Sequence, residues 1–243
     1  MLDERHRGTP RRRPLKVGGL VPFTATDYPG QFAAVVFVQG CPWRCGYCHN
    51  PHLQPRSQPA EIEWDALLAF LARRVGLIDA VVFSGGEPSI DPALAASIDD
   101  VRRLGFKIGL HSAGTHPRRL AHLLPSLDWI GLDVKAPFDD YAHTTRVRAS
   151  GGHARQSLEA VLASGIAYEC RTTAHPDLLP EPALLRVAHE LADLGVEHYV
   201  LQVFRAQGCG SGALNAASLA GYPSDAVLGR LDRLFANFAI RRG

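Results

Sequence analysis

The sequence predicts an α/β protein built as an open, incomplete barrel of six β/α units. From about residue 33 onward, short runs of apolar and β-branched residues alternate with longer segments of helical periodicity. Continuous apolar runs separated by helices are typical of a parallel sheet that is covered on both faces. The units number six rather than the eight of a closed barrel, and none carries a dinucleotide-binding glycine fingerprint.

Each element follows from its own pattern. The first predicted strand, AAVVFV at residues 33–38, is apolar throughout, and the first helix, WDALLAFLARRV at 64–75, repeats apolar residues at helical spacing. The same reasoning places the other strands at 80–83, 106–111, 129–133, 167–173 and 198–204. It places the other helices at 92–104, 117–124, 156–164, 181–194 and 225–238. The polar stretch 137–153 and the glycine-rich stretch 206–223 are predicted to be long loops.

Length and charge indicate one domain with a basic extension. The 243 residues suffice for a full core, and we assign residues 17–243 to a single domain. A net charge of +2 is too small to indicate nucleic acid as the main partner. The first sixteen residues are strongly basic, with Arg5, Arg7, Arg11, Arg12, Arg13 and Lys16. We expect residues 1–16 to form a solvated, poorly ordered arm; a docking arm for an acidic partner is the alternative.

The cysteines indicate metal or redox chemistry in a reducing compartment. No apolar run approaches the length that spans a bilayer, and no signal-peptide core follows the arginines, so we expect a cytoplasmic protein without a membrane partner. Three of the five cysteines, Cys41, Cys45 and Cys48, fall within eight residues. Such a tight cluster is typical of metal binding or redox chemistry rather than of a disulfide framework.

Unusual residues follow each predicted strand at its end. The cysteine loop follows the first strand and Gly85-Gly86-Glu87 follows the second. The later strands end in the remaining candidates: His111 and Ser112, Asp133 and Lys135, Arg171, and Gln202. Because parallel α/β folds build their sites at the carboxyl ends of the strands, we expect all six groups to form one site.

The cysteine spacing favours an iron–sulfur cluster with an open corner. Thiolates at Cys41, Cys45 and Cys48 can hold three irons of a [4Fe–4S] cubane and leave the fourth free for a ligand. A zinc site with His49 as fourth ligand is the main alternative. Adjacent Cys48 and His49 are poorly placed to reach one tetrahedral ion, and no second ligand pair follows downstream.

The triplet, with Tyr47 before the last cysteine, resembles the radical S-adenosylmethionine (SAM) superfamily. Residues 17–50 are similar to the anaerobic ribonucleoside-triphosphate reductase activating proteins, a branch of the glycyl-radical activases. The likeness continues through SGGEP at 84–88, LDVKAP at 132–137, ECRTT at 169–173 and YVLQVF at 199–204. It implies an incomplete (β/α)6 barrel of radical SAM type that holds a [4Fe–4S] cluster and SAM.

The resemblance also implies residue roles. SAM would chelate the open iron through its amino and carboxylate groups, and its cleavage would give a 5′-deoxyadenosyl radical that attacks a glycine of a partner protein. Tyr47 and Gly85-Gly86-Glu87 would contact SAM, the latter at its amino group, while Asp133 and Lys135 would face SAM and the target glycine. Arg171 and Gln202 are weaker candidates for the same pocket.

One position departs from the family. Relatives commonly carry Asp-Thr-Asn-Gly where this chain has His111-Ser112-Ala113-Gly114. Ser112 keeps a hydroxyl, but an imidazole at His111 does not favour a hard cation as a carboxylate does. His111 is therefore expected to hydrogen-bond a ribose hydroxyl or to cap its strand.

Three functions remain open from the sequence. The first is an activase whose partner is a glycyl-radical enzyme, with anaerobic ribonucleotide reductase favoured by the likeness and reduced flavodoxin or ferredoxin as electron donor. The second is a radical SAM enzyme acting on a small molecule or modified nucleoside. The third is an iron–sulfur electron-transfer or zinc module. Of the other thiols, Cys170 is expected to be buried and inert, and Cys209 is a candidate for an exposed reactive thiol.

Overall fold

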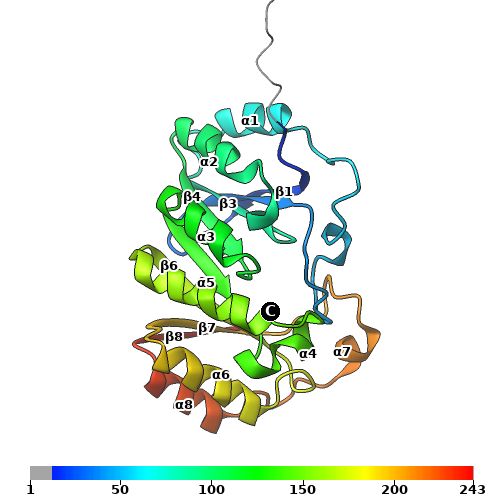
Figure 1. Ribbon diagram of the computed structural model, residues 1–243, viewed down its shortest axis with the longest axis vertical. Coiled ribbons are helices and arrows are strands. Elements are labelled where there is room, and N and C mark those ends of the chain that lie inside the picture. Colours follow the sequence, from blue (N-terminus) through cyan, green and yellow to red (C-terminus); the bar gives the residue numbers. More distant parts are fainter. Residues whose placement is uncertain (1–12, 243) are drawn as a thin grey trace, which may run out of the picture.

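The computed structural model describes residues 13–242 and contains one eight-stranded sheet with its strands in sequence order (Figure 1). The strands are β1 Val17–Thr24, β2 Ala33–Val38, β3 Ala80–Gly85, β4 Lys107–Ser112, β5 Trp129–Asp133, β6 Ala167–Ala174, β7 His198–Val203 and β8 Asn237–Arg241. Strands β2 to β8 are parallel, and β1 is antiparallel to β2. Strands β1 and β8 are the two edges, so the barrel is open, which confirms the predicted fold class.

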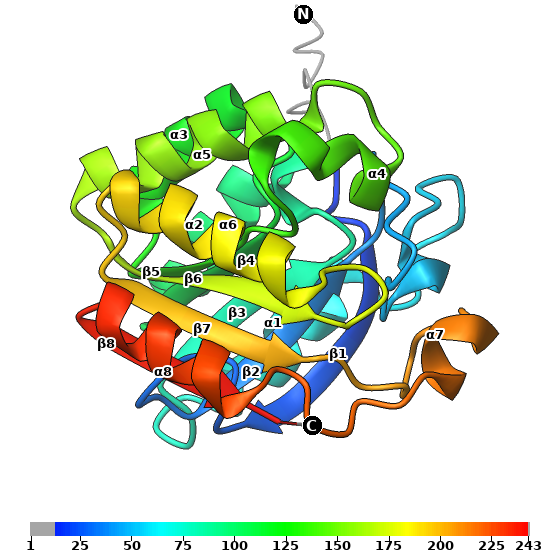
Figure 2. The same cartoon turned by 90° about the horizontal axis from the view of Figure 1, so that it is seen from below.

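Helices connect the parallel strands. The α-helices are α1 Trp64–Ala72, α2 Leu94–Arg103, α3 Pro117–Leu123, α4 Tyr141–Thr145, α5 Ser150–Ser164, α6 Glu181–Asp193, α7 Gly212–Ala216 and α8 Asp225–Leu234. Short 3₁₀ turns lie at Pro51–Leu53, Pro88–Ile90, Leu124–Ser126 and Phe138–Asp140. Figure 2 shows the longer helices packed along one face of the curved sheet. Within the described part of the chain, no helix is long and apolar enough to cross a membrane.

The sheet has an apolar core on each face. The large core lies between the sheet and the helices and includes Phe83, Ile98 and Leu191. The opposite, inner face holds a smaller cluster at the amino ends of the strands, in which Tyr28 stacks on Trp129 at 5.0 Å. This inner cluster closes the lower part of the barrel and leaves the polar side chains of the same face at the carboxyl ends.

Two strands were not predicted. Strand β1 contains Gly18, Gly19 and Pro22, which break the strand pattern, and its pairing with β2 is irregular at both ends. Strand β8 overlaps the predicted helix 225–238, because α8 ends at Leu234 and the chain then extends along β7. Both are edge strands, which need less continuous hydrophobicity than the buried central ones.

The stretch 137–153, predicted to be a loop, contains helix α4 and the first turn of α5. Its glycine pair, Gly151-Gly152, has low intrinsic helix propensity, but α5 packs against both α3 and α4, and this tertiary packing prevails. The predicted loop 206–223 likewise includes the short helix α7.

Most of the expected basic arm, residues 1–12, lies outside the described residues. Of its remainder, Leu15 is buried in the large core and Lys16 donates hydrogen bonds from Nζ to the carbonyls of Arg56 and Gln58. The packed structure therefore includes these two residues ahead of the expected boundary at residue 17.

Candidate functional site

A pocket of about 270 Å³ lies at the carboxyl ends of the parallel strands. Its lining gathers nearly every side chain that the sequence singled out: Cys41, Cys45, Tyr47, Cys48, Gly85, Gly86, His111, Ser112, Asp133, Lys135, Arg171 and Gln202. The exception is Glu87, which lies behind the pocket wall. The six strand-end groups thus form one site, as the topology predicts.

The cysteine loop is held in place by its own backbone and by two neighbouring segments. The amide of Cys41 donates to the carbonyl of Gln54 at 3.1 Å, and the amide of Arg44 donates to the carbonyl of Thr145 at 2.9 Å. Trp43 is buried, with its ring 5.6 Å from that of Tyr141. The loop therefore has a fixed position between the segment that follows it and α4.

The three thiols fit a cubane cluster. All three line the pocket and are partly buried, and burial, followed by the nearby Glu87 carboxylate, raises the pKa of Cys41 to about 12. A thiol with a raised pKa, such as that of Cys41, keeps its proton until a metal replaces it. Among the described residues, no three His, Cys, Asp or Glu side chains converge on a point for a single ion. A cubane does not need that convergence, since each thiolate binds a different iron.

The glycine pair brings the end of β3 against the cysteine loop. The amide of Gly86 donates to the carbonyl of Val38 at 2.9 Å and that of Glu87 to the carbonyl of Gly40 at 2.8 Å. A Cβ on Gly86 would overlap the carbonyl oxygen of Gly40. The sequence reasoning attributed this pair to close approach of a ligand; the structure shows that it also allows close approach of the loop that carries the thiols.

Gly86→Ala is accordingly expected to displace the cysteine loop. We expect a loss of about 1–3 kcal/mol in unfolding free energy, typical of overpacking, and a lower iron content after anaerobic reconstitution. The matched control is Gly46→Ala in the same loop, where a Cβ meets nothing within 4 Å. Urea unfolding measures the stability of both variants, and iron analysis measures how much iron each one holds after reconstitution. Equal iron content in the two variants would contradict the expectation.

Glu87 acts inside the protein rather than in the pocket. Its Oε1 accepts hydrogen bonds from the hydroxyl of Ser89 at 2.6 Å and from that of Ser112 at 2.8 Å, and its Oε2 accepts from the amide of Ala113 at 2.9 Å. The side chain is fully buried. Glu87 therefore ties the end of β3 to the end of β4, and both of its oxygens already have donors.

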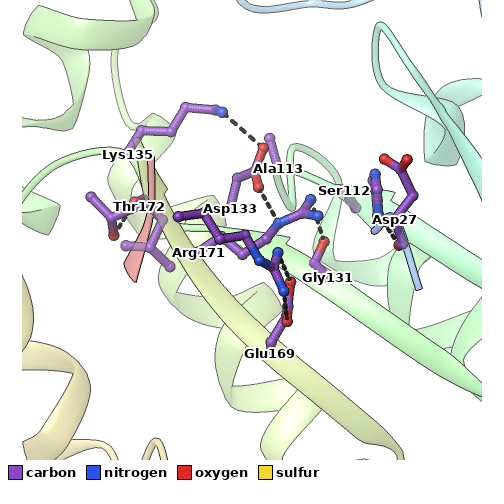
Figure 3. A network of polar contacts seen from close by, with 12 residues as sticks. Asp27, Ser112, Ala113, Gly131, Asp133, Lys135, Glu169, Arg171 and Thr172 are labelled. Atoms are coloured by element: carbon purple, nitrogen blue, oxygen red, sulfur yellow. Dashed lines mark hydrogen bonds and ion pairs between the residues drawn. The ribbon is translucent and has the colours of Figure 1, made fainter. Parts of the chain in front are cut away.

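The acid predicted to face SAM, Asp133, lies between two cations (Figure 3). Its Oδ1 accepts from Nε of Arg171 at 2.9 Å and its Oδ2 from Nζ of Lys135 at 3.3 Å. Arg171 is buried and also donates to the carbonyl of Gly131, where a Cβ would lie 2.7 Å from the guanidinium carbon. Glycine at 131 thus makes room for the arginine across the inner face of the sheet.

The charges in this network stabilise one another. Burial disfavours the carboxylate, but Arg171 and Lys135 outweigh it and lower the pKa of Asp133 to about 2. Burial also disfavours the ammonium, yet Tyr47 and Asp133 raise the pKa of Lys135 well above its usual value. With two cations for one anion, the network keeps a net positive charge that faces the pocket and suits an anionic ligand group.

The depressed pKa of Asp133 predicts a pH dependence of stability. The folded-state pKa of about 2 lies below the unfolded value of about 3.9, so the contribution is complete above about pH 4. It is lost as the pH falls toward 2, because protonation then removes the partner of Arg171. In urea unfolding between pH 5 and pH 2, Asp133→Asn should lower stability at pH 5 and flatten the dependence. A variant with the wild-type slope would contradict the assignment.

His111 is turned toward the protein and is neutral. Its Nε2–H donates to the backbone carbonyl of Asp27 at 2.8 Å, and its ring packs edge-on against Trp129. Burial and then the nearby Arg171 lower its pKa to about 3. His111 therefore fixes the turn before β2 at the pocket, while the neighbouring Ser112 contributes its hydroxyl to Glu87.

Tyr47 and Gln202 complete the predicted set. The ring of Tyr47 lies 5.5 Å from Nζ of Lys135, in cation–π geometry, and its buried hydroxyl has no hydrogen-bond partner within the described structure. Gln202 lines the pocket from β7.

Sequence reasoning missed Asp27 and Arg205 as lining residues. Arg205 lies two residues after the end of strand β7, and the rule that placed the other candidates at strand ends would have included it. Asp27 had no such signal, because it belongs to the turn between β1 and β2, and its place at the pocket depends on its contact with the distant His111.

The other two thiols, Cys170 and Cys209, were expected to differ in exposure, but both are buried. Cys170 is fully buried, as predicted, and burial raises its pKa. Cys209, considered as an exposed thiol, is instead buried in a cluster with Tyr47, Phe204 and Leu214. The loop around it folds back onto the cysteine loop, where Gly208 packs against the carbonyl of His49.

Comparisons with known proteins agree with this site. The family model described as the radical SAM superfamily matches residues 35–182. A protein of Methanocaldococcus jannaschii named as a glycyl-radical enzyme activating enzyme is 28% identical over 198 residues, which cover 77% of this chain and 79% of that one. The pyruvate formate-lyase-activating enzyme of Clostridium pasteurianum is 34% identical over 122 residues, 47% of this chain and 50% of its own.

A likeness to solved structures supports the fold. SuiB of Streptococcus suis, solved bound to S-adenosylmethionine, superposes with a TM-score of 0.60 at 13% sequence identity. The superposition covers 84% of this chain and 48% of SuiB. The chain therefore spans about half the length of SuiB and of the clostridial enzyme.

Proposed function

Because the chain belongs to the radical SAM superfamily, we propose that it is a glycyl-radical activating enzyme that cleaves SAM at a [4Fe–4S] cluster. The observation that carries the proposal is the single pocket that contains three partly buried thiols, a glycine turn and a cationic network. The relatives named as activating enzymes support the activase class.

The proposal gives each residue a role. Cys41, Cys45 and Cys48 hold three irons. The carbonyls at Gly85 and Gly86, rather than the internally bonded Glu87, receive the amino group of SAM. Lys135 and Arg171 attract its carboxylate, with Asp133 fixing both cations. Tyr47, His111, Ser112 and Gln202 line the remainder of the SAM site.

The chain's own contribution is positioning. When bound, the cluster would supply the electron for reductive cleavage of SAM, the chemistry that generates a radical on a target glycine. The fixed cysteine loop sets where the thiolates lie, and the Asp133 network presents a positive charge in a partly buried site, where attraction to a carboxylate is stronger than in water. Trp43, which is buried and part of the pocket lining, limits the access of water there.

The decisive experiment is anaerobic reconstitution with iron and sulfide. We expect three to four irons per chain, a reduced cluster whose EPR signal changes when SAM is added, and methionine with 5′-deoxyadenosine as products. No response to SAM would overturn the proposal and leave an electron-transfer or zinc module.

The proposed partner is an anaerobic ribonucleoside-triphosphate reductase, with reduced flavodoxin or ferredoxin as donor in the cytoplasm. Its support is the likeness of residues 17–50 and of the strand-end motifs to that branch of activases. Incubation with the reductase should give the EPR doublet of a glycyl radical, and pyruvate formate-lyase serves as the comparison partner. Turnover of a small molecule alone, without either protein, would favour a small-molecule radical SAM enzyme instead.

A further inference from the structure

The cysteine loop separates two pockets. The inner pocket is the one described above, and a second, outer pocket of about 450 Å³ lies on the other side of the loop. Of the residues that the structure describes, only Cys45 and Cys48 line both. A group held by these two thiols is therefore close to the outer surface at a place where SAM is not expected to bind.

The outer pocket is cationic. Among the described residues its lining includes two charged side chains, Arg44 and Arg146, both exposed, and no acid. The two are brought together by the hydrogen bond from the amide of Arg44 to the carbonyl of Thr145, the residue before Arg146. Arg44 also donates from Nη1 to the carbonyls of Cys41 and Trp43, so one of the two charges is anchored on the cysteine loop itself.

The rest of the pocket is mostly small and apolar. Pro51, Ala213, Leu178 and Leu214 lie around the two thiols, and Leu214 belongs to the buried cluster that contains Tyr47 and Cys209. An apolar centre beside a pair of exposed arginines matches a small, transient interface, in which charges steer the encounter and little area is buried.

We propose that this outer pocket is the docking site of the electron donor, a small acidic protein that carries one electron at a time. The inference rests on the proposed function and adds the surface through which the cluster is reduced. In the step concerned, the reduced carrier loses one electron and the cluster gains it, and no covalent bond forms or breaks. The acidic surface of the carrier pairs with Arg44 and Arg146, and its redox group approaches Cys45 and Cys48.

The test is the charge reversal Arg146→Glu in the reconstituted protein. Titration calorimetry with an acidic flavodoxin should show a dissociation constant raised about tenfold or more at low salt, and stopped-flow reduction of the cluster by that reduced flavodoxin should slow accordingly. Arg146→Lys should keep affinity within about threefold. The affinity of the wild type should weaken as salt is added, because the charges are exposed.

The matched control is Arg118→Glu, which makes the same change in net charge at an exposed position on α3, outside the pocket lining. Its affinity for flavodoxin should stay within about twofold of the wild type. Equal effects of Arg146→Glu and Arg118→Glu, or no effect of Arg146→Glu, would overturn the docking site.

Dithionite separates this inference from the proposed function. Dithionite needs no docking surface, so Arg146→Glu should be reduced by it, and should then cleave SAM, at the wild-type rate. If the wild type fails to cleave SAM with dithionite, the proposed function fails. The calorimetric comparison of the variants still decides the docking site in that case, because it measures binding and not turnover.

Discussion

Replacement of Cys41, Cys45 or Cys48 by alanine is expected to abolish SAM cleavage, with 5′-deoxyadenosine below detection. Each thiol is one of only three that line the pocket within the described residues, and the neighbouring ring of His49 is already hydrogen-bonded through Nε2 to the carbonyl of Arg205. Iron analysis and chromatography of the products after anaerobic reconstitution provide the measurement.

The control for this result is Cys170→Ala. Cys170 is fully buried on the helix-covered face of β6, so its loss leaves a small cavity without touching the pocket. We expect a modest loss of stability, near 1 kcal/mol, and full cleavage activity. An inactive but folded Cys170→Ala variant, or an active variant at any of the three loop positions, would contradict the assignment.

The second large effect is expected for Arg171→Met, which removes the buried guanidinium between Gly131 and Asp133. Breaking the pair should cost about 2–3 kcal/mol, less than for a fully buried pair, because the Asp133 side chain is 32% exposed. SAM affinity should fall about tenfold or more, since Asp133 loses its fixed position and the pocket loses a positive charge. Urea unfolding and titration with SAM give both quantities.

The control for Arg171→Met is Arg241→Met, which separates an effect on protein stability from an effect on SAM binding. Arg241 forms a two-pronged pair with the buried Glu169 on the same inner face, at 2.7 and 2.8 Å, but does not line the pocket. Its loss should destabilise the protein while SAM affinity stays within about twofold. If both variants lose SAM affinity equally, Arg171 acts only through stability.

The sequence predicts the central part of this molecule well for a physical reason. Strands β2 to β7 are buried on both faces, so they require continuous apolar residues, and the polar residues that interrupt this pattern at their ends are those that face the pocket. The same reasoning fails at β1 and β8, whose edge positions tolerate glycine, proline and polar residues.

Contacts between distant segments were not accessible from the sequence. Nothing in the sequence of residues 84–88 indicates that Glu87 accepts hydrogen bonds from Ser112 and Ala113 rather than from a ligand. The hydrogen bond of His111 to the carbonyl of Asp27 joins residues 84 positions apart. The local sequence pattern shows which residue types are present at a strand end. The direction of each side chain depends on its neighbours in the sheet, which the local pattern does not contain.

Within the described residues, β1 and β8 are unpaired edges of the sheet, and this has a topological consequence. A polypeptide loop whose two ends belong to a folded partner has no free end, so it can enter a closed ring of strands only folded back on itself, with both of its limbs in the opening. A ring with a gap imposes no such restriction, because the loop can be laid in from the side and withdrawn again with both ends still attached. Closing this sheet with a β1–β8 pairing would leave the chemistry of the rim unchanged and would leave such a loop only the open end of the barrel as its way in.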